Sequence, residues 1–590
     1  MRLFHSRHSC VRDCNFQGRF QSMPIYEEKR QGKRKCVLIL IAAFFVLYMP
    51  FQLGERELRW DEVYYAPMAL EMNLLNPNTI AHGEVISSNY PMYPWMVSIL
   101  YDIGASPEFG LRLVSVLSIL AMSVIAWEAG RRAVGIQTAV VSTSLLISSI
   151  IMIDKGVDGY PDMLGLLFIL SGWIAWFTYG PARGNWNRAW LVSFFFCGLA
   201  FYTIGWKGVF IFGLPLIFMR RPMTIWSRLN KPGLFLGVAI LVFFILIWGI
   251  PRWLAGADIP FRNIPFKPDD FLDYLGHIFF FPFEFFLRSL PLSIFAWPAF
   301  CAAYTPLDRN PVFSRFLKTI TVSVFFFLWL YPFADPRDYV ILVPPLAILA
   351  GMNYWLMVRR LGFQTHHLLK ILDMAGIACA VLALLFYTVP TKLWSAILMK
   401  SMLSQLVQLD KLLGFRQENL VIGICFAGIS ILILAMSIRN SPRKYPAWLH
   451  ALSLTCAMSL LFWSVIYPYQ TYEKRQRQLA RQIREAMGED FRSSMTIYKE
   501  SNIPLYSLCT YLQCARRSSF PPLYNYEKIK IKKIDNVKEL QEINGEIYIF
   551  SDEYPIPVGR PPHTRKIPVN EEKNIFLWKF PAAEAGGAVK

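Results

Sequence analysis

The sequence is poor in charge, and its histidines do not have the spacing of a metal site. Only 17% of the 590 residues are charged, whereas 54% are hydrophobic and 15% are aromatic. Apolar runs of about twenty residues, the length that crosses a bilayer, recur along the chain. These features exclude a soluble protein built around one large core. We expect an α-helical polytopic membrane protein.

Cysteine is scattered rather than clustered. Several of the ten cysteines fall inside apolar runs, where a cysteine is usually a small buried hydrophobe. Cys10 and Cys14 lie in a basic tail, and their spacing is weak evidence for a metal. Cys509 and Cys514 lie in a polar region, and a disulfide between them is one interpretation. We therefore expect no cofactor.

The net charge of +19 does not indicate a nucleic-acid partner. The basic residues form short clusters between apolar runs, which is where the orientation of a membrane protein places them. The basic start of the chain also lacks a small-residue cleavage site before its first apolar run. We expect that run to be a retained helix, with a lipid bilayer and not a nucleic acid as the surroundings of the chain.

Three regions follow from this pattern. Residues 1–36 are predicted to be a basic cytoplasmic tail, and residues 37–467 to hold about thirteen membrane helices. Two long loops, 54–108 and 251–285, interrupt the helices. Residues 468–590 alternate short apolar runs with Gly, Pro and Asn, which predicts a small α/β domain.

One topology places every compact Arg/Lys cluster in the cytoplasm. With the tail inside, the acidic loops and the C-terminal domain then lie on the opposite face. We expect a multi-pass protein of the cytoplasmic (inner) cell membrane, with its active site on the outer side.

The stretch Arg59–Ala66 leaves the membrane after the first helix and carries two adjacent carboxylates, Asp61 and Glu62. A glycosyl transfer from a lipid phosphate needs a carboxylate to take a proton from the acceptor hydroxyl, and cations to stabilise the departing phosphate. Asp61 is the predicted base, and Lys207 and Arg337 are the predicted phosphate-binding residues.

Several candidate residues also have a structural interpretation. Asp162 follows Pro161 at a helix start, so the helix dipole could explain it as well as catalysis could. Arg337 and Asp338 could simply pair with each other. Lys207 lies within apolar sequence, where an ionisable residue usually faces a cavity or a partner.

Four further residues are predicted to contact substrate, namely Tyr65, Tyr339, Arg288 and Arg262. A divalent metal stays an open alternative, because Asp61, Glu62 and Asp162 could approach one another in space.

Five segments, in this order, resemble motifs of the polyprenyl-phosphate-dependent GT-C glycosyltransferases of family 39 and its relatives. That family includes the protein O-mannosyltransferases and the aminoarabinose transferase of lipid A. The segments are Asp61-Glu62 with Tyr65-Ala66, Gly110–Leu113 with Gly130–Arg132, Pro161–Leu164, Gly198–Gly208, and Arg337–Pro345. The resemblance covers roughly residues 37–360.

The resemblance implies an inverting transfer of a sugar from a polyprenyl phosphate to an acceptor outside the cytoplasm. The acceptor can be a protein, a lipid or a surface glycan. Asp61 would be the base, supported by Glu62 and Asp162. One departure concerns the lipid A branch, whose Lys-Pro-Pro segment corresponds here to Tyr90-Pro91-Met92, without a lysine.

Three other interpretations stay open. A lipid or oligosaccharide flippase or transporter would place its ionisable residues near the bilayer midplane, whereas here they gather at one surface. A noncatalytic membrane anchor would leave Lys207 without a role. A polymerase or ligase would move a whole glycan instead of one sugar.

Overall fold

The computed structural model describes part of the chain, including its side chains. The described residues are 30–48, 57–58, 62–72, 78–81, 84–86, 89–219, 229–256, 270–301, 310–331, 334–361, 364–390, 393, 424, 428, 446–462, 476–488, 496–500, 506–516, 524–526, 530–534, 546–551, 565–570 and 575–581. Two predicted site residues, Asp61 and Arg262, lie outside them.

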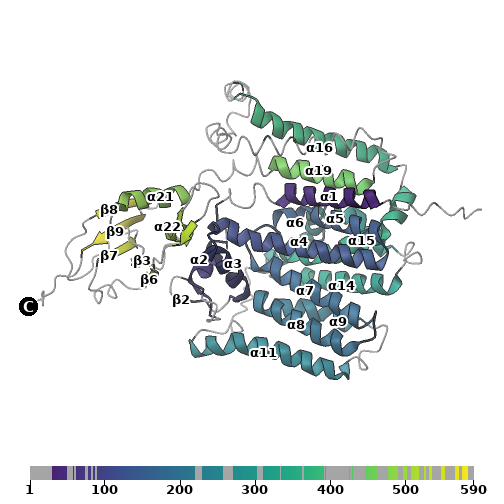
Figure 1. The fold of residues 1–590 in the computed structure, drawn as a ribbon, viewed down its shortest axis with the longest axis horizontal. Coiled ribbons are helices and arrows are strands. Elements are labelled where there is room, and N and C mark those ends of the chain that lie inside the picture. The colour runs from purple at the N-terminus through teal and green to yellow at the C-terminus, as the bar shows by residue number, and fades with distance from the viewer. Residues whose placement is uncertain are drawn as a thin grey trace, which may run out of the picture.

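Most of the described chain is a stack of helices that lie side by side in Figure 1, here called the helical body. Its elements are α1 (Arg30–Tyr48), α4 (Pro107–Ala133), α5 (Ile136–Ile147), α6 (Ile150–Asp154), α7 (Pro161–Tyr179), α8 (Trp186–Ile204), α9 (Trp206–Phe218), α11 (Pro232–Leu254), α12 (Asp270–Arg288), α13 (Leu292–Ala296), η1 (Trp297–Phe300), α14 (Pro311–Leu330), η3 (Asp338–Leu342), α15 (Val343–Leu361), α16 (Gln364–Thr388) and α19 (Ala447–Leu461).

The helical body has the properties of a membrane domain. Within the described residues, 5 helices are long and apolar enough to cross a bilayer, or up to 6 if a bent pair counts as one span. Shorter apolar helices, among them α5, α9 and α19, accompany them. The predicted helical polytopic membrane fold is confirmed, while the number of thirteen helices stays a prediction.

The predicted loop 251–285 is wrong in its second half, where α12 begins at Asp270. The aspartates at its start suggested a solvated loop. The helix that begins there continues through a mostly apolar sequence to Arg288. The chain then bends by 94° between Tyr274–Arg288 and Leu292–Phe300, so these two helices together form at most one broken span.

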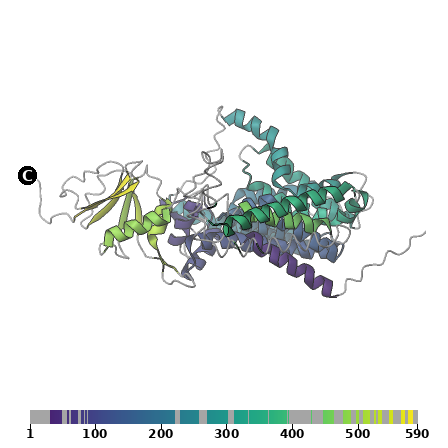
Figure 2. The same ribbon diagram turned by 90° about the horizontal axis from the view of Figure 1, so that it is seen from above.

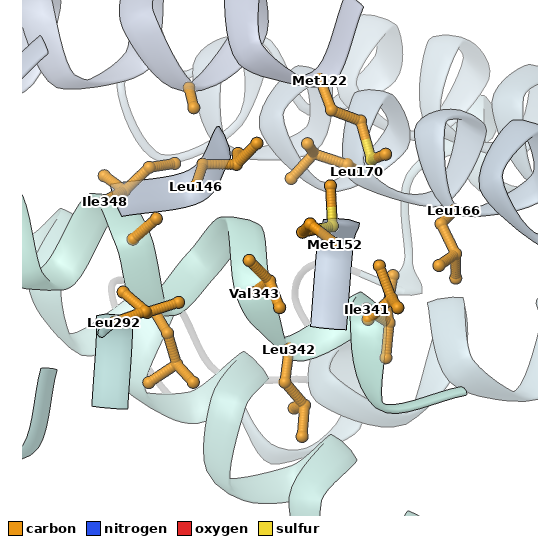
Figure 3. Close-up of a cluster of buried hydrophobic side chains, with 14 of the residues drawn as sticks. Met122, Leu146, Met152, Leu166, Leu170, Leu292, Ile341, Leu342, Val343 and Ile348 are labelled. Carbon is orange, nitrogen blue, oxygen red and sulfur yellow. The ribbon is translucent and has the colours of Figure 1, made fainter. Parts of the chain in front are cut away.

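The core of the helical body holds η3 in place. Figure 3 shows Leu342 and Val343 among side chains of α4, α6, α7 and α13. Ile341, Leu342 and Val343 are all at most 1% exposed. Because η3 is anchored in this core, the two residues at its start, Asp338 and Tyr339, have a fixed place.

The first loop and the C-terminal region lie at the same end of the helical body (Figures 1 and 2). The loop contributes α2 (Glu62–Glu71), β1 (Ile80–Ala81), β2 (Glu84–Val85) and α3 (Met92–Asp102). The described C-terminal residues from Gln476 to Pro581, here called the C-terminal unit, begin with α21 (Gln476–Met487).

The C-terminal unit contains a mixed sheet in the order β6-β3-β7-β9-β8. Its strands are β3 (Thr496–Glu500), β6 (Lys530–Ile534), β7 (Ile547–Ser551), β8 (Arg565–Asn570) and β9 (Ile575–Phe580). Helix α22 (Tyr506–Gln513) leads into a small hairpin of β4 (Cys514–Arg516) and β5 (Tyr524–Tyr526). Short strands and helices were expected of this region, and both are present among its described residues. Cys509 and Cys514 are both thiols, so no disulfide joins them.

The crossing of α15 over α5 depends on a glycine. A Cβ atom at Gly351 would lie 2.2 Å from the side-chain oxygen of Ser142 and 2.8 Å from the carbonyl oxygen of Thr138. We expect Gly351→Ala to destabilise the protein by about 1–3 kcal/mol, because the backbones must move apart. Thermal unfolding in detergent measures this effect.

Gly249→Ala is the matched control, because a Cβ there meets nothing within 4 Å. It should leave the unfolding temperature at or near that of the wild type. Equal unfolding temperatures for the two variants would contradict the close packing of α15 on α5.

Candidate active site

Lys207 lies at the centre of a charged cluster built from three separate elements. Its Nζ is 3.6 Å from Oδ1 of Asp162 in the first turn of α7, and it donates a hydrogen bond to Oδ1 of Asp338 at the start of η3. The Lys207 side chain is 29% exposed and that of Asp338 is 2% exposed. The cluster therefore combines one cation with two carboxylates, and it stays open on the side of Lys207 and Asp162.

The tight turn before Lys207 requires glycine. Gly205 has φ 71°, and a Cβ there would lie 2.0 Å from the Tyr90 ring. Tyr90 in turn stacks on Trp248 of α11, with ring centroids 5.1 Å apart. Tyr90 of the first loop thus packs against the turn that leads into Lys207.

Asp338 does not pair with Arg337, as one interpretation of the sequence suggested. Its Oδ1 accepts from Lys207, and its Oδ2 accepts the backbone N–H of Asp335 at 3.2 Å. A nearly buried carboxylate needs such partners, because desolvation penalises an unpaired charge. Asp338 therefore fixes Lys207, a role that the sequence did not assign to it.

Arg337 lies on Tyr160 instead. Its guanidinium carbon is 3.6 Å from the centroid of the Tyr160 ring, and its Nη2 donates to the Tyr160 hydroxyl at 2.8 Å. Tyr160 meets Tyr65 of α2 edge to face, with centroids 6.3 Å apart. The structure thus brings Tyr65 and Arg337, two predicted site residues, to the same aromatic group.

Glu62 is buried and fully engaged. Its side chain is 1% exposed, Arg112 donates to its Oε1 at 3.0 Å and to its Oε2 at 2.8 Å, and the Gly159 backbone N–H donates to Oε1 at 2.7 Å. These contacts favour a positioning role over proton transfer, because both oxygens already accept. Arg112 was missed as a functional residue, although a charge within an apolar helix was the signal.

Arg288 and Tyr339 meet at a different carboxylate. Arg288 Nε donates to Oε1 of Glu284 at 2.7 Å, and the Tyr339 hydroxyl lies 3.5 Å from its Oε2. Arg288 also approaches Oδ2 of Asp154 at 3.4 Å. Tyr339 follows Asp338 directly on η3, so adjacent residues of one element contribute to the two clusters.

Within the described residues, no group of three or more His, Cys, Asp or Glu side chains is placed to hold a metal ion. Asp162 and Asp338 both pair with Lys207, so the ammonium group lies between these two carboxylates.

The buried pair of Glu62 and Arg112 predicts a large effect on stability. Glu62→Gln leaves the Arg112 charge buried without its counter-ion, and we expect a loss of about 3 kcal/mol or more. Thermal unfolding in detergent tests this expectation.

Glu128→Gln provides the control, because Glu128 lies on α4, the helix that carries Arg112. Glu128 pairs with Arg131 and Arg132, whose side chains are 49% and 59% exposed. Exposed pairs contribute about 1 kcal/mol or less, so this variant should unfold close to the wild type. A Glu62→Gln protein as stable as Glu128→Gln would contradict the anchoring role of the buried pair.

Comparison with known proteins finds sequence similarity over part of the chain. The family described as dolichyl-phosphate-mannose-protein mannosyltransferase matches residues 88–248. An uncharacterized protein of Aquifex aeolicus is 28% identical over 222 residues, which are 36% of this chain and 43% of that protein. The undecaprenyl phosphate-α-4-amino-4-deoxy-L-arabinose arabinosyl transferase 1 of Pseudomonas fluorescens is 27% identical over 225 residues, 36% of this chain and 39% of that protein. The match thus spans less than half of the length of these curated relatives.

Solved structures extend the similarity to nearly the whole chain. Crystal structures of ArnT from Cupriavidus metallidurans, bound to undecaprenyl phosphate and in the apo state, have TM-scores of 0.61 and 0.64 with this protein. Each is 16% identical, and the similarity covers 92% of this chain and 97% of the other. At that identity the likeness concerns the fold. The predicted resemblance to the GT-C polyprenyl-phosphate-dependent glycosyltransferases of family 39 is confirmed, by sequence similarity over part of the chain and by similarity of fold over nearly all of it.

Proposed function

We propose that this protein is a membrane glycosyltransferase that moves a sugar from a polyprenyl-phosphate donor to an acceptor on the outer side of the membrane. The observation that carries the proposal is the cluster in which Lys207 meets Asp162 and Asp338. A second cation, Arg337, directly precedes Asp338 and lies on the Tyr160 ring. The relatives named for undecaprenyl-phosphate and dolichyl-phosphate sugars support the choice of donor.

The reaction assigns Asp61 the role of general base. The acceptor hydroxyl attacks the anomeric carbon, the bond from that carbon to the phosphate oxygen breaks, and the electron pair stays on the phosphate. Asp61 takes the hydroxyl proton, and attack opposite the leaving group inverts the configuration. Glu62 supports this step by fixing the start of α2, directly after Asp61.

Lys207 is the proposed phosphate-binding cation. Its contact with Asp162 is 3.6 Å long, beyond an ordinary hydrogen bond, whereas Asp338 binds it directly. A donor phosphate therefore competes with Asp162 for the ammonium group while Asp338 keeps the lysine in place. Asp162 then has a supporting electrostatic role. Arg337 supplies the second cation, with its plane set by Tyr160.

The remaining parts of the proposal concern substrates and orientation. Tyr65, Tyr339, Arg288 and Arg262 are proposed to contact the sugar or the acceptor, and the acceptor is a protein, a lipid or a surface glycan. The positive-inside rule supports a cytoplasmic N-terminus, and hence an outer position for the first loop and the C-terminal unit.

Asp61→Asn is the first test of the mechanism. Asparagine keeps the shape of the side chain but does not accept the proton. We expect at least a ~100-fold loss of transfer, the size of effect that a general base contributes. Transfer of radiolabelled sugar from defined polyprenyl-phosphate donors into membranes carrying each variant measures this effect.

The outcomes of this assay separate the alternatives. Undiminished transfer by Asp61→Asn would remove Asp61 from the mechanism. Wild-type protein that transfers no sugar from any donor, but moves the lipid between leaflets, would replace the proposal with a flippase. Transfer of a complete glycan instead of one sugar would identify a ligase.

Arg337→Lys tests the phosphate site. Lysine keeps the charge but loses the planar contact and the bond to Tyr160. We expect the donor KM to rise about 10-fold with little change in kcat, because a lysine does not reproduce a stacked and hydrogen-bonded guanidinium.

Arg183→Lys is its matched control, since Arg183 lies over the Tyr179 ring at 5.5 Å in another part of the helical body. Its donor KM should equal that of the wild type. A normal KM in both variants would show that Arg337 does not bind the donor.

A further inference from the structure

The first loop is joined to the C-terminal unit by a carboxylate that caps a helix. Glu57 accepts the backbone N–H groups of Gln476 at 2.8 Å and Arg477 at 3.0 Å, the first two residues of α21. The N–H groups at a helix start have no partner within the helix, and the helix dipole favours a negative charge there. Glu57 therefore binds α21 by its N-terminus.

Tyr511 of α22 makes a second link, through two hydrogen bonds of its hydroxyl group. Its hydroxyl accepts the Leu58 backbone N–H at 3.0 Å and donates to Oε1 of Glu108 at 2.7 Å. Arg477 reaches the same Glu108 oxygen at 2.5 Å. One hydroxyl thus ties the first loop, the C-terminal unit and the start of α4 together.

Burial and neighbouring charges shift the pKa values of the ionisable groups at this interface. Burial lowers the pKa of Arg477, but Glu108 and Tyr511 raise it by more, so that it lies above its usual range. Burial, with Glu108 next, raises the pKa of the Tyr511 hydroxyl well above 10, which keeps the proton that it donates. Burial also raises the pKa of Glu57 against the opposing effect of its two N–H partners.

The helical body holds the same segment from the other side. Arg112 donates to the Glu57 carbonyl oxygen at 3.0 Å, besides its two bonds to Glu62. Leu58 and Ala66 share a buried apolar cluster with Leu508 and Leu512 of α22. Residues 57, 58 and 62 are therefore fixed on both sides of position 61.

We propose that Glu57, Tyr511 and Arg477 are positioning residues, through which the C-terminal unit holds residues 57 and 58, on the N-terminal side of position 61, and hence sets the rate of the chemical step. This inference rests on the proposed function. It differs from a role in attachment alone, because it predicts a lower kcat at unchanged donor binding. Lys207 and Arg337, the proposed phosphate ligands, make none of the contacts described for this interface.

Tyr511→Phe is the sharpest variant, because it removes both hydrogen bonds and keeps the ring. Tyr548→Phe is the matched control: its hydroxyl is directed at Glu546 within the C-terminal unit, at 3.3 Å. We expect Tyr511→Phe to lower kcat by about 10- to 100-fold, the scale of a small misplacement of a catalytic group, with the donor KM and the donor-binding stoichiometry unchanged. Tyr548→Phe should keep the wild-type kcat.

Hydrogen exchange provides a readout that needs no activity. Peptides covering Leu58 and α2 should exchange faster in Tyr511→Phe than in the wild type or in Tyr548→Phe, while peptides of α7 and α9 stay unchanged. Arg477→Lys keeps a charge for Glu108, and we expect it to lose less kcat than Arg477→Ala.

The results separate the two proposals. An active wild type together with unchanged kcat and exchange in Tyr511→Phe would overturn the positioning role and leave the glycosyltransferase proposal in place. A lower kcat with a parallel loss of donor-binding stoichiometry would also overturn it, since unfolding would then explain both. A wild type that binds no polyprenyl phosphate and transfers no sugar would overturn the proposed function instead.

Discussion

The arrangement of the candidate site depends on one buried ion pair, Glu62 with Arg112. Both side chains are almost fully buried, and removing charges from water costs several kcal/mol per ion unless every polar atom finds a partner. Besides their bonds to each other, Glu62 accepts the backbone N–H of Gly159, and Arg112 donates to the carbonyl oxygen of Glu57. The desolvation cost therefore selects one arrangement of the first loop on the helical body.

A second balance of charge fixes Lys207. Lys207 emerges from apolar sequence, where its ammonium group needs a counter-charge, and two carboxylates from α7 and η3 provide it. Since η3 is embedded in the core of the helical body, Asp338 transmits the rigidity of that core to Lys207. The site thus combines a firmly held cation with a carboxylate, Asp162, that stays partly accessible.

The sequence predicts the separate parts of this site better than their connections. The helical membrane fold follows from the length of the apolar runs. Lys207 stands out because a charge interrupts such a run. The partners of these residues are less predictable, because Glu62 meets Arg112 and Lys207 meets Asp338 across 50 and 131 positions of sequence. No local pattern indicates contacts of that range. Helix α12 was not expected, because charged residues near its start are typical of a solvated loop.

The links between Glu57 and α21 also have a consequence for biosynthesis. Their hydrogen bonds connect residues that are 419 and 420 positions apart, and the bond from Leu58 to Tyr511 spans 453. Because a chain is made from its N-terminus and folds unit by unit, the first loop is synthesised long before its partners exist. A nascent chain can insert its early helices, but the segment around position 61 gains its last contacts only when α22 has been translated. Completion of these contacts therefore requires that the chain has been made at least as far as α22.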